Sequence, residues 1–273
     1  MGTYKLLALD MDGTMLSSSK HILPRTLQAI KAAAKGGAAI ALCTGRAVNE
    51  LAEFRPQLAG AVRYASLLSG GHVYDLSCNT TIAAEPLDAD AVQAIIAQGR
   101  REDAMVHVLT TVTTAAAKRD VARMGEVGMG IYQPMFRELC TIVDDIGQFV
   151  DAPAGEICKI NLYHTSGASR ERSRERLGSL GAQLTYAEET SLEITPAGVT
   201  KAMGLERLCA HVGCSLAECV AVGDAPNDLD ALRVAGLAVA MGNATPEVKR
   251  AADLVVSDND HDGVAEVIER FFA

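Results

Sequence analysis

Short apolar runs alternate with helical segments at both ends of this chain, and this alternation constrains its fold more than any other feature. The apolar runs cover residues 6–9, 38–43, 64–68, 219–222, 238–240 and 254–256. Segments with helical spacing cover residues 24–34, 47–54, 200–212, 228–235, 246–252 and 263–271. Strands that alternate with helices in this way form a parallel sheet with helices on both faces. The two ends of the chain therefore predict an α/β fold.

The middle of the chain has a different pattern. A predicted helix at residues 88–101 is followed by strand-like runs at 105–109, 157–163 and 183–186. Pro86 and the stretch Pro196-Ala197-Gly198 mark the two ends of this region. We therefore expect a Rossmann-like, doubly wound core domain made of residues 1–82 and 190–273. A separate α/β domain of residues 83–189 is expected to be inserted into it.

Composition and charge exclude several classes of partner. The 273 residues have a formal net charge of −9, which disfavours binding to nucleic acid or to an anionic membrane. No apolar run approaches the roughly 18 residues of a membrane span, and acidic residues interrupt the first run, so no signal peptide is expected. The seven scattered cysteines fit neither a disulfide framework nor a usual zinc spacing. We expect a cytoplasmic protein, either a monomer or a small homo-oligomer.

Two aspartates one residue apart, Asp10 and Asp12, follow the first apolar run. Residues two apart in an extended segment point to the same side, so both carboxylates can face one site. Gly13 then allows the chain to turn sharply. Buried like charges repel, so this arrangement needs a compensating partner such as a metal ion.

Three further segments reach the same edge of the predicted sheet, where open α/β sheets bind their ligands. Thr44 offers a hydroxyl group after the second apolar run, and Gly45 lets backbone N–H groups approach an anion. Lys201 begins a helix and can neutralise a phosphoryl group. The stretch Gly223–Asp228 supplies two more carboxylates and the Asn227 amide. Carboxylates without neighbouring His or Cys predict a Mg²⁺ site beside a site for a tetrahedral oxyanion.

At these residues the sequence resembles the haloacid dehalogenase (HAD) superfamily of phosphohydrolases. The four motifs of that superfamily occur in order, as DMDGT, the Thr of CTGR, the Lys of GVTKA, and GDAPND. The long stretch between the second and third motifs resembles the Cof-like branch, which carries a large α/β cap domain there. The segments SLEITPAGVTKA, MGNATPEVKRAADLVV and DNDHDGVAEVI are also similar to that branch. The resemblance covers essentially the whole chain and is weakest in the cap.

The resemblance implies a role for each site residue. Asp10 would be the nucleophile that forms an aspartyl-phosphate, and Asp12 would protonate the leaving oxygen and then activate water. The phosphoryl oxygens would be held by Thr44, Lys201 and Asn227. Mg²⁺ would be bound by the Asp10 carboxylate, the Asp12 backbone carbonyl and Asp224, with Asp228 orienting a water on the metal or Lys201. The implied activity is Mg²⁺-dependent hydrolysis of a small phosphorylated metabolite, such as a sugar phosphate, flavin mononucleotide, a ribityl phosphate or pyridoxal phosphate.

Two other functions remain open at this point. A phosphomutase or phosphotransferase would use the same aspartyl nucleophile, but it would need a second phosphate site in the cap. A non-enzymatic phospho-receiver protein also places carboxylates, Thr and Lys around Mg²⁺, although such a protein is usually one small domain. Asp12 and the inserted domain favour the hydrolase. Relatives often have Asn-Gly-Ala where this chain has Gly70-Gly71-His72, which leaves a substrate contact at His72 open.

Overall fold

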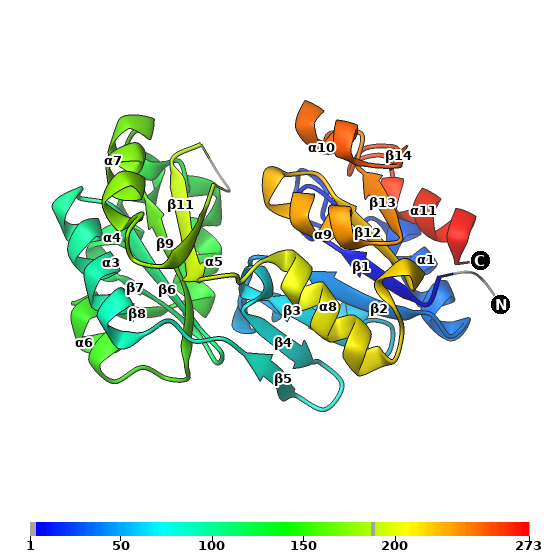
Figure 1. Ribbon diagram of the computed structural model, residues 1–273, viewed down its shortest axis with the longest axis horizontal. Helices are drawn as coiled ribbons and strands as arrows, with labels where there is room; N and C mark the ends of the chain where they lie inside the picture. The colour runs from blue at the N-terminus through cyan, green and yellow to red at the C-terminus, as the bar shows by residue number, and fades with distance from the viewer. Residues whose placement is uncertain (1–3, 187–188, 273) are drawn as a thin grey trace. The chain divides into compact units, whose positions relative to one another are not determined.

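The computed structural model describes residues 4–186 and 189–272, which form two compact units (Figure 1). Unit 1 contains the residues up to Gly45, then Glu53–Ala83, and the residues from Thr200 onward. Unit 2 contains Arg46–Ala52 and Ala84–Val199. Unit 2 is thus inserted into unit 1, and it also takes up a short segment that follows Gly45.

Unit 1 is built on a sheet whose strand order is β14-β13-β12-β1-β2-β3-β4-β5. The strands are β1 (Leu6–Leu9), β2 (Ala39–Cys43), β3 (Tyr64–Leu67), β4 (His72–Asp75), β5 (Thr80–Ala84), β12 (Cys219–Gly223), β13 (Leu237–Ala240) and β14 (Leu254–Val255). All neighbours from β14 to β3 are parallel, and β4 is antiparallel to β3. The central strand β1 is fully buried, as a strand covered on both faces must be.

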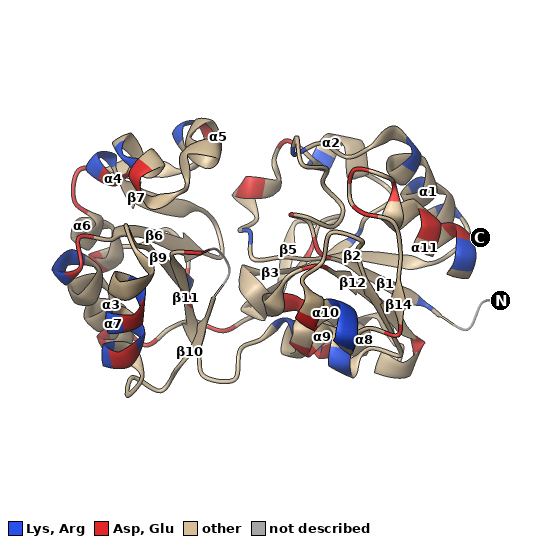
Figure 2. Cartoon of the chain, turned by 90° about the horizontal axis from the view of Figure 1, so that it is seen from above, with Lys and Arg blue, Asp and Glu red and all other residues tan. Residues whose placement is uncertain are grey.

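Helices cover both faces of this sheet (Figure 2). One layer contains α1 (Pro24–Lys35) and α11 (Gly263–Phe271); the other contains α8 (Lys201–Val212), α9 (Leu229–Val234) and α10 (Pro246–Ala251). The helix starts follow from the sequence: Pro24 opens α1, and the hydroxyl group of Thr200 caps α8 by accepting from the Met203 N–H. The predicted α/β class with a parallel core sheet is confirmed.

The helix predicted over residues 47–54 is wrong. The chain forms a short 3₁₀ turn at Asn49–Leu51 and then a separate helix, α2 (Arg55–Leu58). Pro56 lies in the first turn of α2. Proline has no N–H to donate to the preceding turn, so it begins a helix rather than continuing one.

Unit 2 has its own sheet, with strand order β10-β11-β9-β6-β7-β8. The strands are β6 (Met105–Thr110), β7 (Thr114–Ala117), β8 (Thr141–Val143), β9 (Ile157–Tyr163), β10 (Ala182–Thr185) and β11 (Ser191–Pro196). β11 pairs with β9 and β10, so residues 191–196 lie in this sheet although the sequence assigned them to the core domain. The chain returns to unit 1 only after Pro196-Ala197-Gly198, at Thr200.

The two faces of this second sheet are covered differently. On one face α3 (Ala89–Arg101), α6 (Ile146–Asp151) and α7 (Gly167–Leu177) pack over an apolar layer that includes Val106, Ile160, Leu162, Leu192 and Ile194. A smaller apolar cluster with Met105, Phe136 and Tyr163 involves α4 (Lys118–Ala122) and α5 (Gln133–Leu139). Among the described residues, no helix is both long and apolar enough to cross a membrane.

Candidate active site

A buried lysine joins two carboxylates at the carboxyl ends of β1 and β12. Lys201 Nζ lies 2.7 Å from Asp10 Oδ1 and 2.6 Å from Asp228 Oδ1, and all three side chains are buried. Asp10 directly follows β1, Lys201 begins α8, and Asp228 ends the turn after β12. Burial by itself lowers the pKa of Lys201, but attraction to Asp10 and Asp228 outweighs it and holds that pKa well above its usual range.

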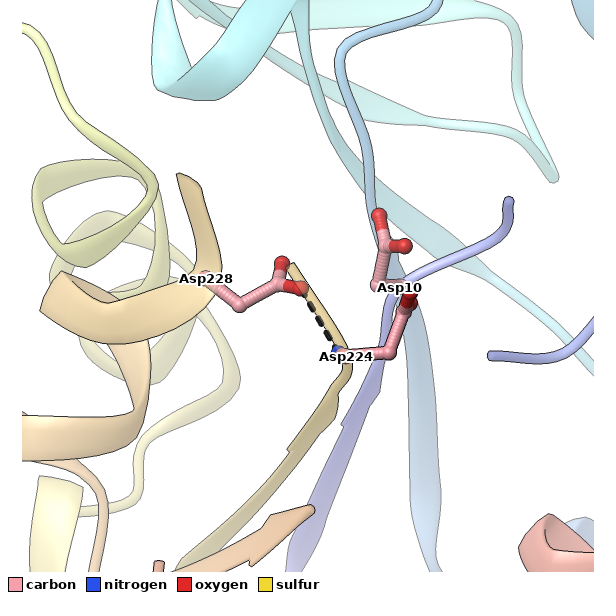
Figure 3. A group of neighbouring side chains, drawn as sticks. All are labelled: Asp10, Asp224 and Asp228. Carbon is pink, nitrogen blue, oxygen red and sulfur yellow. Dashed lines mark hydrogen bonds between the residues drawn. The ribbon is translucent and has the colours of Figure 1, made fainter. Parts of the chain in front are cut away.

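Asp224, the residue after β12, adds a third carboxylate (Figure 3). Asp10, Asp224 and Asp228 each offer a carboxylate oxygen, and these oxygens lie within 4.8 Å of one another. The Thr14 hydroxyl donates to Asp224 Oδ1 at 2.8 Å. Burial raises the pKa of Asp224 to about 6; the hydrogen bond from Thr14 opposes this rise, and repulsion from Asp228 adds to it.

The cluster holds more negative than positive charge, because three carboxylates face the single ammonium group of Lys201. Burial raises the pKa of Asp10 well above its usual range, with attraction to Lys201 opposing the rise and repulsion from Asp228 and Asp224 adding to it. A divalent cation would remove this excess, and carboxylate oxygens are the ligands that Mg²⁺ prefers. Nearby in the chain, Asn227 Oδ1 is buried and has no hydrogen-bond partner. The residues present therefore fit Mg²⁺.

Asp228 differs from the other two carboxylates in the number of its hydrogen bonds. Its Oδ1 accepts from Lys201, while its Oδ2 accepts from the backbone N–H groups of Asp224 at 2.9 Å and Ala225 at 3.0 Å. A Cβ atom at Gly223 would lie 2.5 Å from the Asp228 side chain, so only glycine fits there. Asp228 thus holds in place both the ammonium group of Lys201 and the loop that carries Asp224. Asp10 and Asp224 are the better candidates for direct ligands of Mg²⁺.

Asp12 has a different partner from Asp10. Its Oδ1 accepts from Lys20 Nζ at 2.9 Å, and both side chains are about one-third exposed. Gly13 has a φ of 83°, and a Cβ atom there would lie 2.4 Å from Asp224 Oδ2. The group of three carboxylates found in the described part of the chain does not include Asp12. A Mg²⁺ contact through the Asp12 backbone carbonyl stays a prediction.

Thr44 and Gly45 follow β2, the neighbour of β1. The register Leu9↔Leu42 places the residues after these two strands at the same edge of the sheet. Thr44 is buried, and its backbone N–H donates to the Ser66 carbonyl at 2.9 Å. Because no helix begins directly after Gly45, an anion at this point would meet loop backbone rather than a helix N-terminus.

The structure adds site residues that the sequence did not single out. Thr14 orients Asp224 through its hydrogen bond. Asn243, in the loop after β13, donates from Nδ2 to the Gly13 carbonyl oxygen at a distance of 2.8 Å. Leu68 and Ser69, directly after β3, have positive φ values of 54° and 58°. The Ser69 N–H donates to the Thr44 carbonyl at 3.1 Å. Backbone strain of this kind clusters at functional sites, but an apolar residue such as Leu68 gives no sign of it in a sequence.

His72, whose role the sequence left open, lies in β4 and is fully buried. Its Nε2 lies 2.9 Å from Thr81 Oγ1. Burial lowers the pKa of His72 to about 4, so the ring is neutral near pH 7. These contacts place His72 in the packing of the strands β4 and β5.

Comparisons with known proteins show the family of this chain. The sequence profile of the haloacid dehalogenase-like hydrolases matches residues 7–268. The chain belongs to this family. Pyridoxal phosphate phosphatase YbhA of Escherichia coli (strain K12) is 27% identical over 282 residues, which cover 97% of this chain and 98% of that protein. The HMP-PP phosphatase of Serratia proteamaculans (strain 568) is 29% identical over 250 residues, covering 90% and 86%.

The fold has close matches among solved structures of this family. The crystal structure of a haloacid dehalogenase-like hydrolase from Bacteroides thetaiotaomicron matches with a TM-score of 0.84 at 24% identity, covering 98% of this chain and 99% of that one. This likeness confirms the fold. The family match confirms the resemblance that the four motifs indicated. Since the two relatives are named phosphatases, the predicted enzyme class, a phosphoric monoester hydrolase, is also confirmed.

Proposed function

We propose that this hydrolase is a Mg²⁺-dependent phosphatase that hydrolyses a small phosphorylated metabolite through an aspartyl-phosphate on Asp10. The observation that carries the proposal is the buried carboxylate of Asp10, held at 2.7 Å by Lys201 within a cluster of excess negative charge. The relatives named for pyridoxal phosphate and HMP-PP support a small phosphorylated substrate.

In the first step, an Asp10 carboxylate oxygen attacks the phosphorus atom and the bond from phosphorus to the ester oxygen breaks. Asp12 donates a proton to that leaving oxygen, so the alcohol departs neutral. Asp12 suits this role because its carboxyl group is partly exposed and is separate from the buried cluster.

In the second step, the Asp12 carboxylate takes a proton from water, whose oxygen attacks the phosphorus atom of the aspartyl-phosphate. The bond between phosphorus and Asp10 breaks, which regenerates the carboxylate and releases inorganic phosphate. The contact with Lys20 Nζ at 2.9 Å would hold the Asp12 carboxylate in place for this step.

Phosphoryl transfer is catalysed mainly by positioning and charge neutralisation. Lys201 would neutralise the phosphoryl oxygens, and Thr44 would hold them from the end of β2. Mg²⁺, held by Asp10 and Asp224, would supply the remaining positive charge. Asp228 would keep Lys201 in place through its 2.6 Å contact.

Phosphate release from a panel of phosphorylated metabolites tests the proposal. The panel contains sugar phosphates, flavin mononucleotide, pyridoxal phosphate and a ribityl phosphate, each measured with Mg²⁺ and with EDTA. The variants are Asp10→Asn and, as a matched control, Asp90→Asn at an exposed position of α3. Release that is lost in EDTA and in Asp10→Asn, but kept in the control, supports the proposal. Release by Asp10→Asn at the wild-type rate would overturn it, and transfer to an acceptor alcohol without free phosphate would indicate a phosphotransferase.

A further inference from the structure

The turn that follows Leu16 in unit 1 carries a lysine in an unfavourable backbone conformation. An antiparallel bridge pairs Leu16 with Ile22, and the Lys20 N–H donates to the Ser17 carbonyl oxygen at 2.9 Å, which closes a tight turn. Lys20 has a φ of 64°. This left-handed conformation suits glycine or asparagine and disfavours a residue with a long side chain. The geometry of the turn therefore does not explain why a lysine stands there.

The ammonium group of Lys20 reaches the carboxylate of Asp12. The two groups are 2.9 Å apart, and about a third of each side chain is exposed. An ion pair that is open to solvent stabilises a fold only slightly, so it does not offset an unfavourable backbone conformation. Residues held in such conformations cluster at functional sites, where the surrounding structure keeps them in place. The contacts around the turn are consistent with such a role.

The loop between β14 and α11 holds this turn. We call residues 257–262 the acidic loop. Asp260 Oδ1 accepts from the Ser18 N–H at 2.8 Å, and Asn259 Nδ2 donates to the Leu16 carbonyl oxygen at 2.9 Å. These two bonds fix the backbone on both sides of the first residue of the turn. The position of Lys20 therefore depends on a loop more than 200 residues further along the chain.

The acidic loop is itself fixed by its aspartates. Asp258 Oδ1 accepts from the Asp260 N–H at 3.0 Å and lies 2.6 Å from His261 Nδ1. Asp262 Oδ1 accepts from the hydroxyl group of Thr26 at 2.9 Å, which ties the loop to α1. The one group of carboxylates in the described part of the chain that could hold a metal ion does not include these aspartates. The acidic loop thus supports the turn and is not a second metal site.

We propose that Lys20 is a positioning residue for Asp12, and that Asn259 and Asp260 act through it by holding the turn. The inference rests on the proposed phosphatase function and deepens it, because Asp12 serves in both steps of that reaction. The same carboxyl group must first face the leaving oxygen and later face the attacking water. Since a small misplacement of a catalytic group can lower a rate by about 10²-fold, a fixed partner at Oδ1 acts on the rate rather than on stability.

The test compares two substrates whose leaving groups differ. p-Nitrophenolate leaves readily without a proton, whereas the alkoxide of a sugar or polyol phosphate needs a general acid. The ratio kcat/KM covers the steps up to release of the alcohol, so it reports on Asp12 as an acid. In Lys20→Met we expect kcat/KM to fall about tenfold or more for the sugar or polyol phosphate, but less than about threefold for p-nitrophenyl phosphate. Asn259→Ala should show the same pattern with a smaller fall.

Three further variants separate positioning from a merely structural role. Lys20→Arg keeps a cation and should retain most of the wild-type kcat/KM for both substrates. Lys20→Gly should lose activity like Lys20→Met, yet its melting temperature should not fall, because glycine adopts a positive φ without strain. The matched control is Lys31→Met at an exposed position of α1, which should behave like the wild type. An equal fall for both substrates in Lys20→Met, or no fall for either, would overturn the inference.

A separate readout distinguishes failure of this inference from failure of the proposed function. If the wild type releases no phosphate from any ester, the phosphatase proposal fails. Crystal structures of the wild type and of Lys20→Met then test the positioning directly. A change of the Asp12 side-chain rotamer in the variant would retain Lys20 as a positioning residue. An Asp12 side chain that keeps its orientation in the variant would overturn the inference.

Discussion

Each unit of this protein buries a lysine against carboxylates, but the two lysines have different surroundings. In unit 1, Lys201 lies between Asp10 and Asp228, with Asp224 close by, so negative charge is in excess. In unit 2, Lys159 pairs with Glu193 at 2.6 Å, and the neighbouring Asn161 and His107 have unpartnered neutral atoms. The first arrangement can hold a cation, whereas the second already pairs its one ammonium group with a carboxylate.

The difference shows why a buried ion pair alone does not identify a function. Both pairs are costly to bury, and breaking either one leaves an uncompensated charge. The two ion pairs differ in the balance of charge and of hydrogen bonds around them. The following predictions test this difference between the two units, beginning with the largest expected effect.

The substitution Asp10→Asn should abolish turnover, because the amide cannot act as the nucleophile. We expect phosphate release to fall by about 10⁴-fold or more. In EDTA the melting temperature of Asp10→Asn should not fall below that of the wild type, because the substitution removes one of the three carboxylates that repel one another. Phosphate assays and thermal unfolding check both parts, and a variant that keeps the wild-type rate would contradict the assignment of Asp10.

The substitution Asp12→Ala should separate catalysis from metal binding. We expect kcat to fall by about 10²- to 10⁴-fold, the usual contribution of a general acid and base. The affinity for Mg²⁺, measured by calorimetry, should change little, because the Asp12 carboxylate pairs with Lys20 and lies outside the three-carboxylate group. A large loss of Mg²⁺ affinity would place Asp12 among the ligands.

Replacing each buried lysine by methionine compares the two units directly. Both Lys201→Met and Lys159→Met should lower the free energy of unfolding by about 3–5 kcal/mol in EDTA, because each removes the positive partner of a buried ion pair. Added Mg²⁺ should restore part of the loss in Lys201→Met only, since the three carboxylates are in unit 1. Urea denaturation with and without Mg²⁺ measures the free energy of unfolding of both variants. An equal gain from Mg²⁺ in both would contradict the proposed difference between the two lysines.

The stability of the Mg²⁺-free protein should depend on pH through Asp224. Burial raises the pKa of Asp224 from 3.8 to about 6, so between these values the folded state binds a proton that the unfolded chain does not. This contribution is fully present below about pH 4 and is lost as the pH rises through about 6, by about 1 kcal/mol per pH unit. Urea denaturation in EDTA checks the slope. Asp224→Asn should flatten it, and an unchanged slope would assign the effect to another group.

Much of unit 1 could be predicted from the sequence because its signals are local. Apolar runs, Pro24 at the start of α1 and the cap at Thr200 each act within a few residues. Parallel strands gather their carboxyl ends at one edge, so the strand pattern predicts that Asp10 and Asp224 meet there, whereas Lys201 was assigned to this edge from its place at the start of a helix. The prediction of a helix at residues 47–54 was wrong, because it relied on apolar spacing and did not take into account that Pro56 begins a separate helix.

The contacts of individual atoms could not be predicted in this way. The pairing of Asp12 with Lys20 depends on a turn in which Lys20 itself has a φ of 64°. Similarly, the sequence analysis predicted no strand at residues 191–196, and only the pairing of β11 with β9 assigns these residues to unit 2.

The sequence by itself determined the fold class and the family, and it predicted which residues carry phosphoryl transfer. Short motifs with fixed residue types specify these, and their backbone positions follow from strand order. Only the tertiary structure decided which charges balance one another and which polar atoms lack partners. His107 of β6, Asn161 of β9 and Glu193 of β11 are cross-strand neighbours far apart in the chain, and long-range pairing of this kind leaves no local signal in a sequence.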